Sequence, residues 1–521
     1  MTTITNFLEQ HGPARSSVVA QWLVDELKLK PEAARKRLSR LRAPLHRFPI
    51  HLLPKGESFI YHVDDRKTER FWTRFLDAMR ASKSGFGATL DALTARGGMV
   101  LTSEFAVIGG TSGMGSRGQL MATSMAERLI KAGAIAQFAG SGNETFYGFA
   151  QPALGSSDRN GHHARQLTED IVLNAVREWI RKLGLASYNT VAIRTEEGRQ
   201  PICGFLFDLA GPSYLLPIRS GGKQPGFVVA DVFSGAVMDE HQIHYFLRKV
   251  ALVNAILKRG GSGVFAFLIA DGFTSAAYTA GHAAGVSLAT PKDLFGVRAG
   301  NALQTLAQTL RNTAAFAASA SPERIAKLID DLSDIEGSAG NLRGVLFELL
   351  CAYLIRRDAQ SINMGVKATD ISTGKVADID ILKYTNQLSD CVAIECKGKE
   401  PGGALSLEEA QDWIRRLPTF FAHIHAGNRE AAVSFELWTS GEIEADALAY
   451  LTREQTKRTK TPIRWRAGKD ILSLAVKGKE RAITDALKQH FFHHPLSKVT
   501  PPPPPPPAPP APPAPPAPAT S

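Results

Sequence analysis

Cysteine is scarce in this sequence, and the few copies present form no recognisable structural pattern. The 521 residues include 4 cysteines, and none of them belongs to a Cys-x-x-Cys pair. This spacing argues against a zinc knuckle and a disulfide scaffold, and it fits a reducing, cytoplasmic environment. Long apolar runs are absent too, since none approaches the ~20 residues that a membrane-spanning helix needs. The first residues lack a basic segment followed by an apolar one, so we expect no signal peptide and no membrane association.

Acidic residues are outnumbered by basic ones. Asp and Glu total 50 against 61 Lys and Arg, which gives a formal net charge of +11. An excess of this kind is typical of proteins that bind polyanions such as nucleic acids. It does not identify a partner by itself, because many basic proteins bind no nucleic acid.

The pattern of residues 1–68 predicts three helices followed by a short hairpin. Gly12 ends the first helix, Pro31 lies in the first turn of the third, and Lys55 stands at the hairpin turn. This order resembles a winged helix-turn-helix, whose third helix enters the major groove of DNA. The candidate DNA contacts are Arg35, Lys36, Arg37, Arg40, Arg42 and Lys55. A protein-binding winged helix with a solvated basic face is the alternative that the sequence leaves open.

A similar order of helices and hairpin returns over 84–150, with Gly-Asn at the tip of the hairpin. We therefore predict a second winged helix, with Arg117 and Arg128 on its third helix as candidate DNA contacts.

Two longer segments share another order: a helix, paired strands, a helix, a strand, a helix and a last short strand. An alanine-rich helical connector separates them, and a proline-rich tail without core-forming residues follows them. Such a tail adopts the polyproline II conformation, and it is either solvated or a ligand for an aromatic-lined groove on a partner. The predicted division of the chain is 1–68, 84–150, 160–298, 299–342, 343–480 and 481–521.

Acids interrupt two apolar strands of the later segment. The stretch ADIDILKY carries Asp378 and Asp380, and DCVAIECKG carries Glu395 followed by Lys397. Residues two apart share one face of a strand, so a hairpin would bring Asp380, Glu395 and Lys397 together at one sheet end. Glu348 lies on the preceding helix. Carboxylates bind hard divalent cations, which activate water and polarise phosphate, while a lysine offsets the charge that develops on the phosphate.

These residues resemble the PD-(D/E)XK nuclease superfamily, which has the restriction-endonuclease-like fold. The resemblance implies that Asp380 and Glu395, helped by Glu348, bind Mg²⁺ or Mn²⁺ and that Lys397 is the catalytic lysine. An exposed strand in which Glu395 and Lys397 form a salt bridge is the alternative.

Two further residues belong to the resemblance. Asp378 stands where some relatives carry an extra acid, and Gln411 stands where several subgroups carry a functional glutamine. The longer form of that motif has a tyrosine four residues on, and this chain has Arg415 there.

The earlier segment, laid over the later one, reads as a degenerate copy. Glu169, Asp208 and Asp231 take the places of the three acids, whereas Phe233 takes the place of the lysine. Gln242 roughly matches the glutamine. We expect this copy to be inactive and to bind DNA or mediate pairing, with an unrelated α/β domain as the alternative.

The expected architecture is a multidomain α/β protein. It consists of two winged helices, a degenerate restriction-endonuclease-like domain, a helical connector, an intact restriction-endonuclease-like domain and a disordered tail. The expected function is metal-dependent cleavage of double-stranded DNA, in a bacterial restriction or defence role that the family resemblance implies. The first alternative is a non-catalytic DNA-binding regulator that uses nuclease-like folds for binding or for forming a homodimer.

A remoter alternative is an NAD(P)-dependent short-chain oxidoreductase. The stretch VIGGTSGMG looks like the glycine-rich turn of short-chain dehydrogenases, and Tyr245 and Lys249 form a Tyr-x-x-x-Lys pair. A dinucleotide site needs a buried strand before the glycines and a helix directly behind them. Here the preceding stretch is short and charged, and SRGQLMATS separates the glycines from the next helix.

Overall fold

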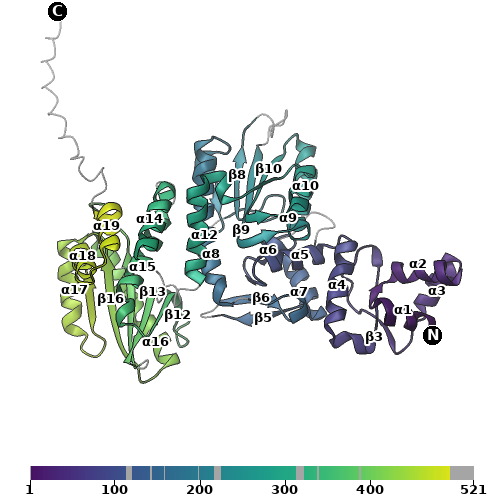
Figure 1. Cartoon of the computed structure of the whole chain (residues 1–521), viewed down its shortest axis with the longest axis horizontal. Coiled ribbons are helices and arrows are strands. Elements are labelled where there is room, and N and C mark those ends of the chain that lie inside the picture. The colour runs from purple at the N-terminus through teal and green to yellow at the C-terminus, as the bar shows by residue number, and fades with distance from the viewer. Residues whose placement is uncertain are drawn as a thin grey trace, which may run out of the picture.

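The computed structural model describes residues 2–112, 120–140, 144–157, 159–196, 199–215, 225–311, 322–336, 340–386 and 389–492. Within these ranges the chain is a multidomain α/β protein with several mixed sheets (Figure 1). Arg117, one of the predicted DNA contacts, and the proline-rich stretch that begins at Pro501 lie outside the described residues. None of the helices in the described ranges has the length and apolar character needed to cross a lipid bilayer.

The N-terminal unit packs three helices against a small antiparallel sheet with the strand order β1-β3-β2. Its elements are α1 (Thr2–His11), β1 (Ala14–Arg15), α2 (Ser16–Leu27), α3 (Pro31–Ser39), β2 (Leu45–Arg47) and β3 (Phe59–His62). Only Ala34 and Leu38 of α3 are buried, so most of the surface of this basic helix faces solvent.

Helix α4 (Glu69–Ala81) joins the N-terminal unit to the next one. The Thr68 hydroxyl caps the helix by accepting a hydrogen bond from the Phe71 N–H at 3.2 Å. The buried face of α4 carries aromatic rings, and Phe75 packs with Phe48 and Phe59 at centroid distances of 4.6 and 5.1 Å. The apolar face of α4 is therefore what attaches the N-terminal unit to the body of the protein.

The second unit repeats the pattern of helices followed by a hairpin, with strand order β4-β6-β5. Its elements are α5 (Gly85–Ala95), β4 (Met99–Leu101), α6 (Phe105–Ile108), α7 (Ala122–Ala132), β5 (Ile135–Ala139) and β6 (Thr145–Phe149). Its core continues into the following unit, because Leu93 and Phe105 belong to the same apolar cluster as Phe207 and Phe246.

The first α/β unit contains a five-stranded sheet in the order β11-β10-β9-β8-β7. Its elements are α8 (Arg159–Lys182), β7 (Ala192–Ile193), β8 (Leu209–Ser213), β9 (Gly226–Met238), α9 (Glu240–Leu257), β10 (Val264–Phe273), α10 (Ser275–Ala283), β11 (Ser287–Ala289), α11 (Pro291–Phe295) and α12 (Val297–Arg311).

The second α/β unit contains a five-stranded sheet in the order β12-β13-β14-β16-β18. Its elements are α14 (Pro322–Glu336), α15 (Gly340–Ile355), β12 (Ser361–Thr369), β13 (Val376–Thr385), β14 (Asp390–Lys397), β15 (Ala404–Leu405), α16 (Leu407–Gly427), β16 (Ala432–Thr439), β17 (Glu442–Ile443), α17 (Ala445–Lys457), β18 (Ile463–Arg466), α18 (Gly468–Lys477) and α19 (Arg481–Leu487).

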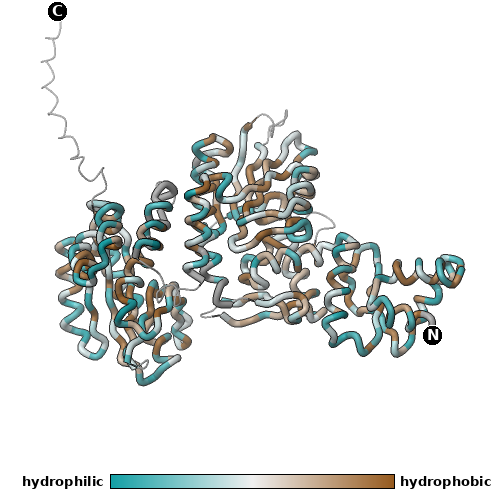
Figure 2. Tube along the Cα trace, viewed as in Figure 1, coloured by the Kyte–Doolittle hydropathy of each residue, from teal (hydrophilic) through white to brown (hydrophobic). Residues whose placement is uncertain are grey.

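Both five-stranded sheets have the same pairing directions. In each, the first three strands along the chain pair antiparallel and the last two add in parallel. Apolar residues concentrate along these strands (Figure 2), as expected for sheets that helices cover on both faces. One apolar cluster spans both units, from Ile171 of α8 through Leu303 of α12 and Leu332 of α14 to Phe347 of α15.

The C-terminal tail begins later than the predicted position 481. Helix α19 and the turn after it continue to Phe492, and Ile483, Leu487 and Phe491 are buried in the cluster that the α/β units share. Their spacing places them on one side of a helix. The sequence contained this apolar pattern, and the predicted tail should have begun after it.

Candidate active site

Strands β13 and β14 bring the predicted acids together. The two strands pair antiparallel with Ile381 opposite Ile394. Asp380 precedes Ile381 and Glu395 follows Ile394, so these two acids lie across from each other. The Cys396 N–H donates a hydrogen bond to Asp380 Oδ2 at 2.6 Å. The alternation of side chains along β14 then places Lys397 on the same face as Glu395.

Glu395 is the centre of the group and is only 2% exposed. Its Oε1 lies 2.8 Å from Lys397 Nζ and 2.9 Å from Arg416 Nη2. Among the described residues, its Oε2 is buried and has no hydrogen-bond partner. Because buried acceptors are almost always satisfied, this oxygen is suited to accept from a donor or to bind a cation.

Burial and neighbouring negative charge raise the pKa of two acids of this site, Glu348 and Asp380. Burial raises the pKa of Glu348 on α15 well above its usual value, and the charges of Asp380 and Glu395 add to the shift. Burial, followed by the charge of Glu395, raises the pKa of Asp380 to about 7. Burial alone would lower the pKa of Lys397, but the ion pair with Glu395 outweighs it and raises that pKa. Added positive charge would therefore stabilise the ionised acids.

The residues present suit a hard divalent cation. Asp380 and Glu395 supply carboxylate oxygens, and Glu395 Oε2 is available to such a cation. Within the described residues, no group of three or more His, Cys, Asp or Glu is arranged so that it could hold a metal ion. Mg²⁺ usually binds through one or two carboxylates and keeps several waters, so Asp380 and Glu395 with Glu348 nearby fit Mg²⁺ or Mn²⁺ at an open site.

The two weaker predictions lie at the edge of this group. Asp378 is exposed and stands opposite Lys367 of β12 in the strand register. Gln411 is exposed on the first turns of α16, and the helix residue that reaches Glu395 is Arg416 instead.

Sequence reasoning missed Arg416, although a signal for it exists. Trp413 and Phe420 of α16 are buried against the sheet, and Arg416 stands three residues after one and four before the other. This spacing places all three on the same side of the helix, so the apolar stripe would have indicated an arginine directed at the sheet.

The first α/β unit holds a matching group of acids. In its sheet, Leu209 lies opposite Ala230, and the Val232 N–H donates to Asp208 Oδ2 at 3.0 Å, as Cys396 does to Asp380. Asp208 and Asp231 therefore occupy the register positions of Asp380 and Glu395. Phe233 falls at the position of Lys397, as the sequence comparison predicts.

Arginines fill this earlier site. Arg96, at the end of α5 in the second unit, lies 2.6 Å from Glu169 Oε2 and 2.7 Å from Asp208 Oδ2, and Arg194 lies 2.7 Å from the same Glu169 oxygen. Burial alone would raise the pKa of Asp208, but Arg96 and Arg194 outweigh it and lower that pKa to about 2. In the later unit Gly365, with φ +61°, takes the register position of Arg194. Strand β12 therefore supplies no side chain opposite Asp380 at that position.

Asp231 of the earlier site is neutralised from helix α9. Lys249 Nζ lies 2.5 Å from its Oδ2, and the Tyr245 hydroxyl donates to the same oxygen at 2.9 Å. The guanidinium of Arg96 stacks 4.2 Å from the centre of the Phe233 ring, which occupies the lysine position. The acids of the earlier unit are thus paired with basic side chains of the chain itself.

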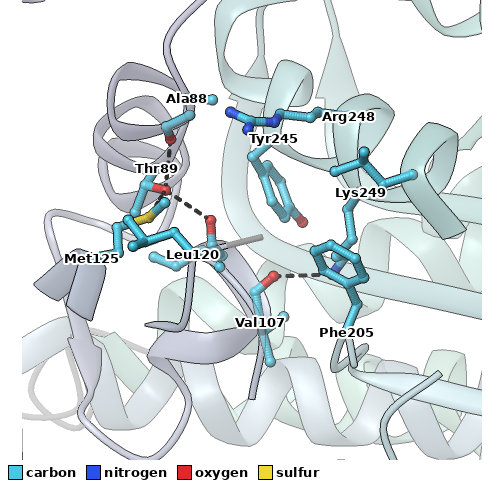
Figure 3. Close-up of a pocket in the computed structure, with 14 residues that line it drawn as sticks. Ala88, Thr89, Val107, Leu120, Met125, Phe205, Tyr245, Arg248 and Lys249 are labelled. Atoms are coloured by element: carbon cyan, nitrogen blue, oxygen red, sulfur yellow. Dashed lines mark hydrogen bonds between the residues drawn. The ribbon is translucent and has the colours of Figure 1, made fainter. Parts of the chain in front are cut away.

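The glycine-rich stretch of the oxidoreductase alternative is described only in part, because Gly113 and Gly115 lie outside the described residues. Tyr245 and Lys249 face a cavity of about 60 Å³ whose other walls include Thr89 and Met125 (Figure 3). Cofactor sites are typically ~300–1,000 Å³. The glycines that begin at Gly109 follow the short helix α6 rather than a buried strand, and Lys249 also donates to the Val107 carbonyl at 3.0 Å.

The predicted DNA contacts of the first unit lie around α3. Arg35, Lys36, Arg40, Arg42 and Lys55 are exposed. One groove of about 1,000 Å³ is lined by Arg35 and Lys55 together with other residues, and a second of about 390 Å³ is lined by Lys36, Arg37, Arg40 and Arg42.

In the second unit, Arg128 is exposed on α7. Lys131 on the same helix is exposed too, but the acidic residue Glu127 directly precedes Arg128, so the basic character of this helix is weaker than that of α3.

The alignment of Gln242 with Gln411 is two residues off. Gln242 forms a capping box with Asp239, and Glu409 forms the corresponding box with Ser406. Gln242 therefore matches Glu409, and its side chain is used to start a helix. Comparison of the chain with protein-family models, with curated proteins and with solved structures finds no match.

Proposed function

We propose that the protein is a metal-dependent deoxyribonuclease that hydrolyses phosphodiester bonds of double-stranded DNA at Asp380, Glu395 and Lys397. The observation that carries this proposal is Glu395, a buried carboxylate with Lys397 on one oxygen and no partner on the other among the described residues. A salt bridge that served stability alone would be expected to satisfy both oxygens.

The proposal assigns the second α/β unit to the PD-(D/E)XK nucleases and the first to a degenerate copy of it. The shared strand order and pairing directions support a duplication. The paired acids of the first unit support its inactivity, because its own arginines and Lys249 already supply the charge that a metal would bring. The family resemblance adds restriction or defence against foreign DNA as the expected setting.

Each residue of the proposed site has a distinct task. A bound Mg²⁺ or Mn²⁺ would supply Lewis acidity and a water of lowered pKa. Asp380 is fixed by the Cys396 N–H, so its position does not depend on a ligand. Lys397 remains charged, since the ion pair with Glu395 raises its pKa, and it can offset the negative charge that develops on the phosphate.

Cleavage of supercoiled plasmid by the full chain tests the proposal. With Mg²⁺ or Mn²⁺ we expect nicked and linear products, and with EDTA we expect none, because the acids need the cation to hold a phosphate near them. Asp380→Asn should abolish cleavage while leaving the thermal unfolding temperature close to that of the wild type.

A second candidate function predicts a different result. In the first α/β unit, Asp208 and Asp231 are paired with Arg96 and Lys249, so an acid group of the same arrangement exists there without free carboxylates. If neither unit cleaves DNA, this arrangement favours a DNA-binding regulator. Binding of plasmid without cleavage in either metal would support that regulator and contradict the nuclease.

The N-terminal units are proposed as winged helix-turn-helix modules that bind the duplex. The exposed lysine and arginine side chains of α3 are the main support, because a basic helix with most of its surface in solvent can enter a major groove. The homodimer and the groove-binding partner of the proline-rich tail remain predictions from the sequence.

We expect Arg35→Ala with Lys36→Ala and Arg40→Ala to weaken duplex binding by the full chain. Each lost phosphate contact should reduce the slope of log affinity against log salt by about 0.9. The measurement is fluorescence anisotropy with a labelled duplex at several salt concentrations, in the absence of divalent metal.

The matched control removes the same charge elsewhere. Lys258, Arg259 and Lys292 are exposed on the first α/β unit, and their joint replacement by alanine should leave the salt slope almost unchanged. Equal effects of the two triple variants would show that only net charge matters, and no binding by the wild type would favour the protein-interaction role of α3.

A further inference from the structure

We propose that Arg416 is a catalytic residue that binds the substrate phosphate, and that its side chain leaves Glu395 to do so. This inference rests on the proposed nuclease function, and it names a residue that the family resemblance does not supply. Its basis is the position of Arg416 on α16, its exposure, and the comparison with the first α/β unit.

The position of Arg416 is set by the start of α16. Ser406 and Glu409 form a capping box that fixes the first turn, and Trp413 packs the next turn into the apolar layer under the sheet. Arg416 is thereby directed at β14, where its Nη2 lies 2.9 Å from Glu395 Oε1. The pairing follows from the packing of the helix and is not a chance surface contact.

The first α/β unit repeats this relation. Its helix α9 starts from the capping box of Asp239, and Lys249 stands ten residues after that cap (239 to 249), as Arg416 stands ten residues after Ser406 (406 to 416). Lys249 reaches Asp231, the acid at the register position of Glu395. A helix cation is therefore present in both units, whereas the cation on the strand itself is present only where Lys397 stands.

The two helix cations differ in how firmly they are enclosed. The Lys249 side chain is 5% exposed and also donates to two carbonyl groups, whereas the Arg416 side chain is 32% exposed and donates to one, that of Asp412 at 3.4 Å. A buried cation with several partners stays in place. A partly exposed guanidinium on a long side chain can leave its acid and turn towards a ligand.

A divalent cation would provide the reason for that movement. One oxygen of Glu395 is shared between Lys397 and Arg416. If Glu395 and Asp380 held a divalent cation, its charge would disfavour a guanidinium on the same carboxylate. The guanidinium is planar and presents several N–H donors, which suits a phosphate oxygen pair better than a shared carboxylate oxygen.

The test compares Arg416→Ala and Arg416→Lys with Arg415→Ala. Arg415 is the adjacent arginine, 72% exposed and paired with Asp412 instead of the acid group. Two quantities are measured on the full chain: Mn²⁺ affinity by calorimetry without DNA, and the single-turnover cleavage rate at saturating Mn²⁺. Thermal unfolding of each variant shows that it is folded.

We expect Arg416→Ala to bind Mn²⁺ at least as tightly as the wild type, because a competing cation is removed. Its cleavage rate should fall by about 100-fold or more, the loss expected when a donor to transition-state charge is removed. Arg416→Lys should recover part of the rate, as a lysine reaches the equivalent acid in the first unit. Arg415→Ala should change neither quantity.

Three results would overturn the inference. Weaker Mn²⁺ binding by Arg416→Ala, in proportion to its loss of cleavage, would show that Arg416 only holds Glu395 in place. Normal cleavage by Arg416→Ala would remove Arg416 from the site and leave the proposed nuclease function intact. A wild type that neither binds Mn²⁺ nor cleaves DNA would overturn the nuclease function and this inference together.

Discussion

Replacement of Lys397 by alanine is expected to reduce DNA cleavage by about 100- to 1,000-fold, the loss typical of removing one group that stabilises transition-state charge. The ion pair with Glu395 raises the pKa of Lys397, so the side chain is cationic at neutral pH when the phosphate reacts. The fold should persist, because Arg416 still pairs with Glu395 in the variant and the lysine is partly exposed.

The measurement is the single-turnover rate at saturating Mn²⁺, with thermal unfolding as a check on folding. Lys399→Ala is the matched control, since that lysine lies two residues further on and pairs with Glu409 at 2.5 Å instead of the acid group. It should keep nearly full activity. Full activity in Lys397→Ala would show that the active site has been assigned to the wrong residues.

The acid group could be predicted because strand geometry is local. Side chains two apart share a face, so the spacing in IECKGK placed Glu395 and Lys397 on one side of their strand, and an expected hairpin would bring Asp380 of ADIDIL next to them. The correspondence between the acids of the two α/β units could be predicted for the same reason, since these acids recur at equal positions in the strand order. The structure then supplied the register, with Ile381 opposite Ile394 and Leu209 opposite Ala230.

The basic partners of the acids could not be predicted in that way. Arg96 is 112 residues from Asp208 in the chain and comes from another unit, so no local pattern connects the two. Arg416 was missed for a different reason. The family resemblance predicted a functional glutamine, and Gln411 was chosen for that reason. The buried Trp413 and Phe420 instead indicate the side of α16 that carries Arg416.

Replacement of Arg96 by methionine is expected to lower the free energy of unfolding by about 3–5 kcal/mol, the usual cost of removing one partner from a buried ion pair. Arg96, Glu169 and Asp208 are each at most 4% exposed as side chains. Without the guanidinium, Asp208 keeps only the more distant Arg194 at 3.8 Å among the ion pairs of the described residues, while Glu169 keeps Arg194 and Arg165. The loss is measured by urea unfolding at pH 7, followed by tryptophan fluorescence.

The pH dependence of this loss has a definite sign. In the wild type the pKa of Asp208 is about 2, below the usual value near ~3.9 in an unfolded chain. Its ionisation therefore stabilises the fold above the unfolded pKa, and this contribution is lost as the pH falls through the folded pKa. In Arg96→Met the depression is weakened, so the difference in stability between variant and wild type should be largest near pH 7 and shrink below about pH 4.

Two matched variants separate a buried network from an ordinary ion pair. Arg298 pairs with Asp330 and Asp331 on the surface, where its side chain is 54% exposed, and Arg298→Ala should cost at most about 1 kcal/mol. Adding Glu169→Gln to Arg96→Met removes one of the unpaired charges and should recover part of the lost stability. If Arg96→Met costs no more than Arg298→Ala, the arginine does not hold the second unit on the first α/β unit, and their shared apolar core does so alone.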